Sequence, residues 1–182
     1  STISPHSRLS YTDNAMTPEF LVGLRSFLLQ GFATECPVAA KVFRAIPDAN
    51  HDYRPDPKSK TAMELGWHIA SVDVWFLDSI AALNFPMGEQ PMPATIKTGA
   101  DLAAWYETAI QASLAKVEAM SPEQLGTPIN FYGLFNMPAA AYLQFFNNHH
   151  IHHRGQLSTY LRPMGGKCPA IYGGSADEPM GA

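Results

Sequence analysis

Four long stretches of this chain carry apolar side chains three and four residues apart, the spacing of an α-helix that buries one face. They span about 17–46, 61–83, 98–120 and 136–163, and polar segments rich in proline and glycine separate them. Alternating strand-like patterns are almost absent, apart from one short extended piece expected around 129–132. The pattern predicts an all-α protein, an antiparallel four-helix bundle. Its long loops are expected to line a site at one end of the bundle.

Capping signals support these boundaries. A threonine or serine at a helix start accepts from a backbone N–H in the first turn, and an acid three residues on can reach back. The signals are Thr17-Pro18-Glu19, Thr61 with Glu64, Thr98 with Asp101, and Ser121 before a short turn. Proline has no N–H to donate, so Pro37 is expected to kink or interrupt the first helix near Cys36. Residues 136–138 are expected to open the last helix.

Composition indicates one globular domain, residues 1–182, with an irregular arm at 1–16 and a loop tail at 165–182. Apolar residues make up 46% of the chain and charged residues 15%. The net charge of -4 argues against a nucleic-acid surface, which needs a basic face. No apolar run approaches the ~18 residues of a membrane span. With no secretory h-region and only two cysteines, we expect a cytoplasmic protein.

The histidines point to a metal site. Four of the seven lie between His149 and His153, inside an aromatic segment and not in a solvated tail. His149 and His153 are four residues apart, so they share one face of a helix and can hold one ion together. His149 with His152, three apart, is an alternative pair.

A third ligand is expected from a facing helix, because catalytic zinc takes three protein ligands and keeps one position open. His68 is the best candidate, since it lies in the apolar face of the second helical stretch. His6 and His51 lie in loops and rank lower. A lone buried histidine is more often a hydrogen-bonded core residue than a ligand. The case therefore rests on His68 together with the pair on the last helix.

The neighbours of the histidine pair have other expected roles. His150 is expected beside the site or on the surface, and Arg154 in a structural salt bridge or on an anionic substrate. Gln156 is expected to orient a ligand histidine. Cys36 is expected to be a small buried apolar residue. Cys168 sits in a loop without an evident base, so it is not assigned as a nucleophile.

Three motifs carry a resemblance to a known family. They are Asn-His-His-Ile-His-His-Arg-Gly-Gln-Leu at 148–157, Tyr53-Arg54-Pro55 followed by Glu-Leu-Gly-Trp-His at 64–68, and Pro169-Ala-Ile-Tyr-Gly with Ser175-Ala-Asp-Glu. With them the chain resembles the DinB/YfiT-like family of metal-binding helix bundles. The resemblance implies a divalent metal bound by His68, His149 and His153, and a homodimer formed through helix faces. It favours His153, directly before Arg154, over His152.

The resemblance also has implications for the function. The superfamily includes thiol-dependent S-transferases and a mycothiol-dependent isomerase, and some members are described as metal-dependent hydrolases. The leading hypothesis is a metal-dependent S-transferase that binds a low-molecular-weight thiol and a small-molecule substrate. Zinc or nickel is expected first, then iron or manganese, because imidazole suits several of these metals. The alternatives are a hydrolase that uses metal-bound hydroxide, with Glu64 or Asp73 as the nearest carboxylates, and a non-catalytic metal-binding or stress-related protein.

Overall fold

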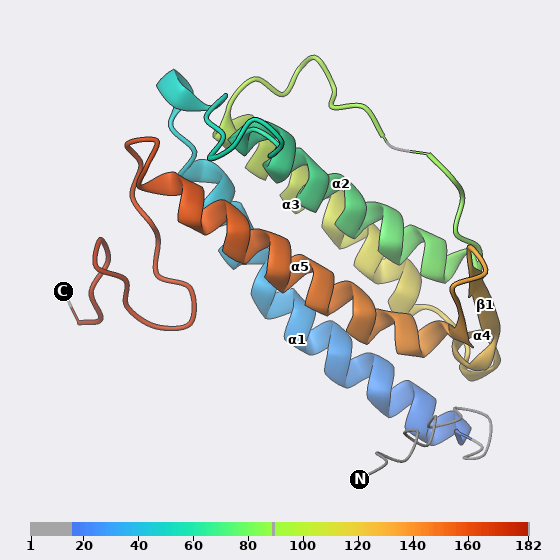
Figure 1. Ribbon diagram of the computed structural model, residues 1–182. Helices are drawn as coiled ribbons and strands as arrows, with labels where there is room; N and C mark the ends of the chain where they lie inside the picture. The colour runs from blue at the N-terminus through green and yellow to red at the C-terminus, as the bar shows by residue number, and fades with distance from the viewer. Residues whose placement is uncertain (1–15, 89, 182) are drawn as a thin grey trace, which may run out of the picture.

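Four long helices pack into a bundle in the computed structural model, which describes residues 16–88 and 90–181 (Figure 1). They are α1 (Pro18–Arg44), α2 (Ala62–Ala81), α3 (Gly99–Glu118) and α5 (Ala139–Leu161). The shorter elements are the 3-10 turn η1 (Asp48–Asn50), α4 (Pro122–Gly126), and an antiparallel hairpin of β1 (Pro128–Phe131) and β2 (Phe135–Pro138). The predicted all-helical bundle is confirmed.

The two long loops lie in different places. Residues 45–61 join α1 to α2 at one end of the bundle, whereas 82–88 and 90–98 run back along α2 before α3 begins (Figure 1). Two indole N–H groups of α2 mark that return path: Trp75 donates to the carbonyl of Pro86 at 3.2 Å, and Trp67 to that of Gln90 at 2.7 Å. As a result α2 and α3 run in the same direction, and α2 packs antiparallel to α5 (Figure 1).

The helix starts follow the predicted caps. Thr61 Oγ1 accepts from the N–H of Glu64 at 3.1 Å, and the Glu64 carboxylate accepts from the N–H of Thr61 at 2.7 Å. Thr98 and Asp101 form the same reciprocal pair at the start of α3. These bonds satisfy N–H groups that have no partner within the helix.

Two predicted boundaries are wrong. The expected interruption near Cys36 does not occur, because α1 continues through Pro37. Pro37 and Ala33 are both exposed, so the hydrogen bond that Pro37 cannot donate to Ala33 is lost on the solvent side of the helix. The last helix starts at Ala139 and not at 136, since residues 136–138 pair with β1, Asn136 opposite Asn130.

The core lies between the four long helices and is rich in aromatic rings. Its largest fully buried apolar side chains are Phe32, Phe43, Tyr106, Tyr142 and Phe146. Gly66 lets α2 approach α3, because a Cβ there would lie 2.7 Å from Leu102 Cδ2. Two aromatic residues of α1 are exposed, Phe20 at 55% and Phe27 at 74%.

The two ends of the chain differ in what is described. Apart from Met16, the predicted arm at 1–16 falls outside the described residues. The tail is irregular, as expected, and is held by Asp177, which accepts from Arg162 Nε and from the N–H of Cys168, each at 2.9 Å. Within the described residues, none of the helices has the length and apolar character to cross a membrane.

Candidate metal centre

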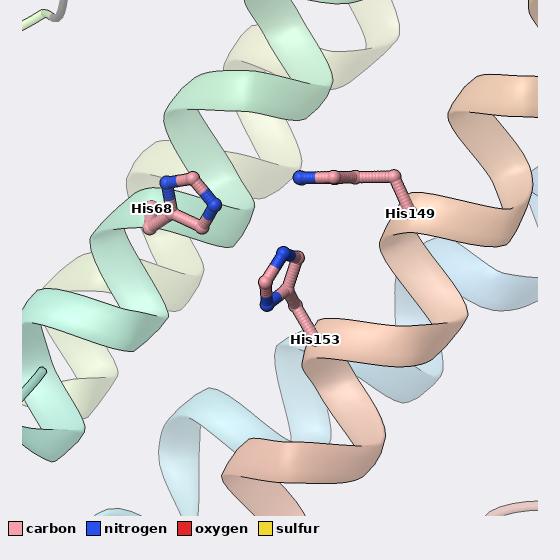
Figure 2. Close-up of side chains that lie close together, drawn as sticks. All are labelled: His68, His149 and His153. Atoms are coloured by element: carbon pink, nitrogen blue, oxygen red, sulfur yellow. The ribbon is translucent and has the colours of Figure 1, made fainter. Parts of the chain in front are cut away.

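Two antiparallel helices bring three histidines to one point. Figure 2 shows His68 reaching from α2 toward His149 and His153 of α5. The ring centroid of His68 lies 5.3 Å from that of His149 and 4.7 Å from that of His153, and the last two are 4.4 Å apart. One nitrogen from each ring lies within 4.8 Å of the other two. This group could hold a metal ion.

The local sequence explains the convergence. His149 and His153 are one turn apart on α5, so both imidazoles leave the helix in the same direction. His68 lies between the buried residues Leu65 and Ile69, at the half-buried edge of α2 that faces α5. The site therefore forms where the apolar stripe of α2 meets solvent.

Burial favours the neutral form of the His149 and His153 imidazoles. Desolvation, followed by the nearby His153 and His68, lowers the pKa of His149 from 6.5 to about 3. The pKa of His153 is also lowered, again chiefly by burial, while its bond to Gln156 opposes the shift. Since a metal binds the neutral imidazole, both side chains have lone pairs available at neutral pH.

Hydrogen bonds distinguish the two ring nitrogens. His153 Nδ1 lies 2.7 Å from Gln156 Oε1, an acceptor, which leaves Nε2 with its lone pair for a ligand. His149 Nδ1 is buried and, among the described residues, has no hydrogen-bond partner. Three converging imidazoles fit zinc, nickel, iron or copper, but not calcium or magnesium, which prefer oxygen.

The other histidines stand outside this group. His152 is exposed and its ring centroid lies 4.9 Å from that of His153, but it does not join the three. The geometry thus brings His153, and not His152, toward His68. His51 is exposed, with Nδ1 2.9 Å from the carbonyl of Asp48. His6 lies outside the described residues.

A buried polar cluster, which was not predicted from the sequence, lies behind the site. His150, expected beside the metal or on the surface, is fully buried in the core, with Nδ1 2.7 Å from Asp73 Oδ2. The same carboxylate oxygen accepts from the Tyr106 hydroxyl at 2.8 Å. One signal existed: Asp73 falls in the apolar stripe of α2, midway between Ile69 and Leu77, where a carboxylate requires partners.

Arg154 forms the second part of this cluster. Its side chain is 2% exposed and pairs with Glu35 of α1, as the predicted structural salt bridge requires. It also donates to the hydroxyl of Tyr172 at 2.6 Å, and that hydroxyl lies 3.0 Å from Glu35 Oε2. The bonds join the tail to α1 and α5.

A cavity of about 750 Å³ opens beside His68. Residues of one face of α2 form its floor, and the 82–98 loop and Tyr132 of the hairpin turn close it on the other side. Glu64 lies at its α2 N-terminal end, one turn before His68. The three-histidine group is therefore next to a space that can hold a small molecule.

These features define a class, the four-helix bundles with a histidine cluster between two helices. The sequence model of the DinB family matches residues 23–180, so the chain belongs to the DinB family.

Two sequence relatives and two solved structures are similar to this chain. The uncharacterised Bacillus subtilis proteins YrdA and YjoA are each 27% identical to the chain, over 155 residues (82% of this chain, 89% of YrdA) and 140 residues (76% of this chain, 89% of YjoA). The crystal structure of the DinB-like protein YjoA superimposes with a TM-score of 0.63 at 26% identity, covering 76% of this chain and 92% of that one. A DinB-like protein from Bacillus cereus gives 0.68 at 24% identity, covering 81% and 97%, and shows the same fold.

Proposed function

We propose that this protein is a divalent-metal-dependent S-transferase, with His68, His149 and His153 as the metal ligands. The observation that carries the proposal is a three-histidine group with no fourth ligand: among the described residues, no further His, Cys, Asp or Glu joins it. A structural zinc site usually has four protein ligands, whereas a catalytic one keeps a position for substrate. This favours an enzyme over a non-catalytic metal-binding protein.

The chemistry follows from the donors. A metal bound there supplies positive charge that favours the thiolate form of a low-molecular-weight thiol. The neutral imidazoles of His149 and His153 leave that charge uncompensated, and Gln156 fixes the orientation of His153. In the transfer, a sulfur–carbon bond forms, the leaving group departs from the electrophile with its electron pair, and the thiol proton passes to solvent.

Hydrolysis is the weaker alternative, because it benefits from a carboxylate base near the metal. Asp73 is buried and bonded to His150 and Tyr106, so it is not available. Glu64 does line the cavity, but the bond from the N–H of Thr61 lowers its pKa, which makes it a poorer base.

Metal content and thiol conjugation test the proposal. We expect close to one equivalent of Zn²⁺ or Ni²⁺ in the wild type, a loss of most of it in His153→Ala, and no change in His152→Ala, the exposed neighbour. Wild type supplied with glutathione, bacillithiol or mycothiol and 1-chloro-2,4-dinitrobenzene should then form the thioether. Unchanged metal content in His153→Ala would refute the proposed metal site. No conjugation with any of the three thiols would refute the transferase activity.

We further propose a homodimer, which the exposed rings of Phe20 and Phe27 support. They are seven residues apart, two turns of α1, and lie on one face of the helix. Exposed large apolar rings on one helix face suit an interface between copies of the chain. A cytoplasmic location stays a prediction from Cys36 and Cys168, neither of which forms a disulfide.

A further inference from the structure

Aromatic rings line the cavity beside His68. Trp67 and Trp75 contribute from α2, and Tyr132 from the tip of the hairpin. Gly88, Gln90, Pro91 and Met92 of the loop between α2 and α3 line the same cavity. Two of the three tryptophans of the chain therefore meet at this cavity, next to a proposed metal ligand.

The loop is fixed to these rings by their own polar groups. Trp67 donates to the carbonyl of Gln90, and the Tyr132 hydroxyl donates to that of Pro86 at 3.0 Å, the same carbonyl that Trp75 reaches. Because the N–H and O–H groups are engaged, the rings offer apolar π surface to a molecule between them. The hydrogen bonds hold the walls of the cavity in place, which limits the entropy lost on binding.

The cleft continues beyond the two indoles. A second chamber of about 550 Å³ shares Trp67 and Trp75 with the first and is lined further along α2 by Ser79. Ser79 is 3% exposed, and its Oγ has no hydrogen-bond partner among the described residues. A buried hydroxyl without a partner is unfavourable, and a polar group of a bound molecule would satisfy it.

We propose that this cleft binds the electrophilic substrate of the transfer reaction, and that the substrate is an aromatic molecule. The inference rests on the function proposed above. The reacting atom lies toward His68, the ring packs against Trp67, Trp75 and Tyr132 in offset or edge-to-face contacts, and a hydrogen-bonding substituent extends toward Ser79. An aliphatic molecule of equal size fits the volume but loses the ring contacts.

A matched pair of probes tests the aromatic preference. 2-Naphthol and its saturated counterpart 2-decalol share one carbon skeleton, and their affinities can be compared by saturation-transfer NMR. We expect 2-naphthol to bind at least threefold more tightly. In protein loaded with Co²⁺ the relaxation of the naphthol protons should be faster than in the Zn²⁺ form, because the paramagnetic ion is close. Equal affinities, or equal relaxation in the two forms, would overturn the proposal.

A blocking variant tests the location. Ser71 lines both chambers, so Ser71→Phe should fill the space between the indoles and weaken 2-naphthol binding more than tenfold. Ser26→Phe makes the same change at an exposed position of α1 and should have no effect. Both variants should keep the metal content of the wild type. Wild-type affinity in Ser71→Phe would place the ligand elsewhere and refute the cleft.

The outcomes separate the cleft from the transferase. Suppose that the protein takes up metal and that Ser71→Phe blocks naphthol binding, but no thiol is conjugated. This result would refute the transferase activity and support a cleft that binds aromatic molecules. Suppose instead that aromatic and aliphatic halides of matched intrinsic reactivity are conjugated equally fast, and that Ser71→Phe does not change the rate. This result would support the transferase activity and refute the cleft as its substrate site.

Discussion

Asp73 is fully buried where α2, α3 and α5 meet, and Asp73→Ala should strongly destabilise the fold. Its Oδ2 accepts two bonds, from Tyr106 at 2.8 Å and from His150 at 2.7 Å. Leaving a buried donor without its partner costs about 1–3 kcal/mol, and Asp73→Ala leaves two such donors. We expect a loss of about 3–5 kcal/mol, because alanine leaves both partners buried without an acceptor.

The chain offers a matched control on the same helix. Asp78 forms an ion pair with Lys116 at 2.9 Å, but the two side chains are 39% and 53% exposed. An exposed pair contributes roughly 0–1 kcal/mol, so Asp78→Ala should lower the free energy of unfolding by no more than that. Urea unfolding followed by far-UV circular dichroism measures both variants. In thermal melts, at about 2–4 °C per kcal/mol, Asp73→Ala should lower the Tm by roughly 6–20 °C.

A third variant separates charge from hydrogen bonding. The amide oxygen of Asp73→Asn can still accept from Tyr106 and His150, so this variant should lie between the wild type and Asp73→Ala. If Asp73→Ala unfolds within about 1 kcal/mol of Asp78→Ala, the buried bonds do not stabilise the bundle as argued.

Four further predictions concern the metal site, the reactivity of the thiols, the pH dependence of stability and the assembly. Gln156→Leu should weaken metal binding about 10–100-fold in a chelator competition, because His153 Nδ1 loses its acceptor, whereas wild-type affinity would show that this bond is dispensable. Burial raises the pKa of the Cys36 thiol from 9.0 to about 12, so in native protein at pH 8 only Cys168 should react with a thiol reagent, and two fast-reacting thiols would contradict this. The same shift means that unfolding releases a proton between pH 9 and 12, so the free energy of unfolding should fall as pH rises through that range. If the proposed homodimer forms, Phe27→Glu should be a monomer in light scattering with size-exclusion chromatography, and a monomeric wild type would refute the dimer.

Local signals were sufficient for the starts of α2 and α3, because each depends on two residues three positions apart. Thr61 with Glu64 and Thr98 with Asp101 form the predicted pairs. Pro37 misled the prediction, since a proline on the exposed side of a long packed helix loses one hydrogen bond without ending the helix. Residues 136–138 also misled it, since their pairing with β1 is a tertiary choice that outweighs local helix propensity.

The site was partly predictable for a similar reason. The spacing of His149 and His153 defines a shared face, and the apolar surroundings of His68 point it inward. However, the path of the loop between α2 and α3 determines which helices pack against each other. That path cannot be predicted from a single sequence. The contact between His150 and Asp73 joins the same two helices, and it was missed because Asp73 in the apolar stripe of α2 was not assigned a buried partner.

The structure explains why four polar side chains are concentrated in two turns of α5. His149 and His153 project from one side toward His68, while His150 and Arg154, each one residue later, project into the core. The spacing of four residues thus serves both pairs. Asp73 and Glu35 bind the buried pair from α2 and α1, and this fixes the rotation of α5 about its axis. Because a helix rotates as a unit, the same bonds set the direction of His149 and His153.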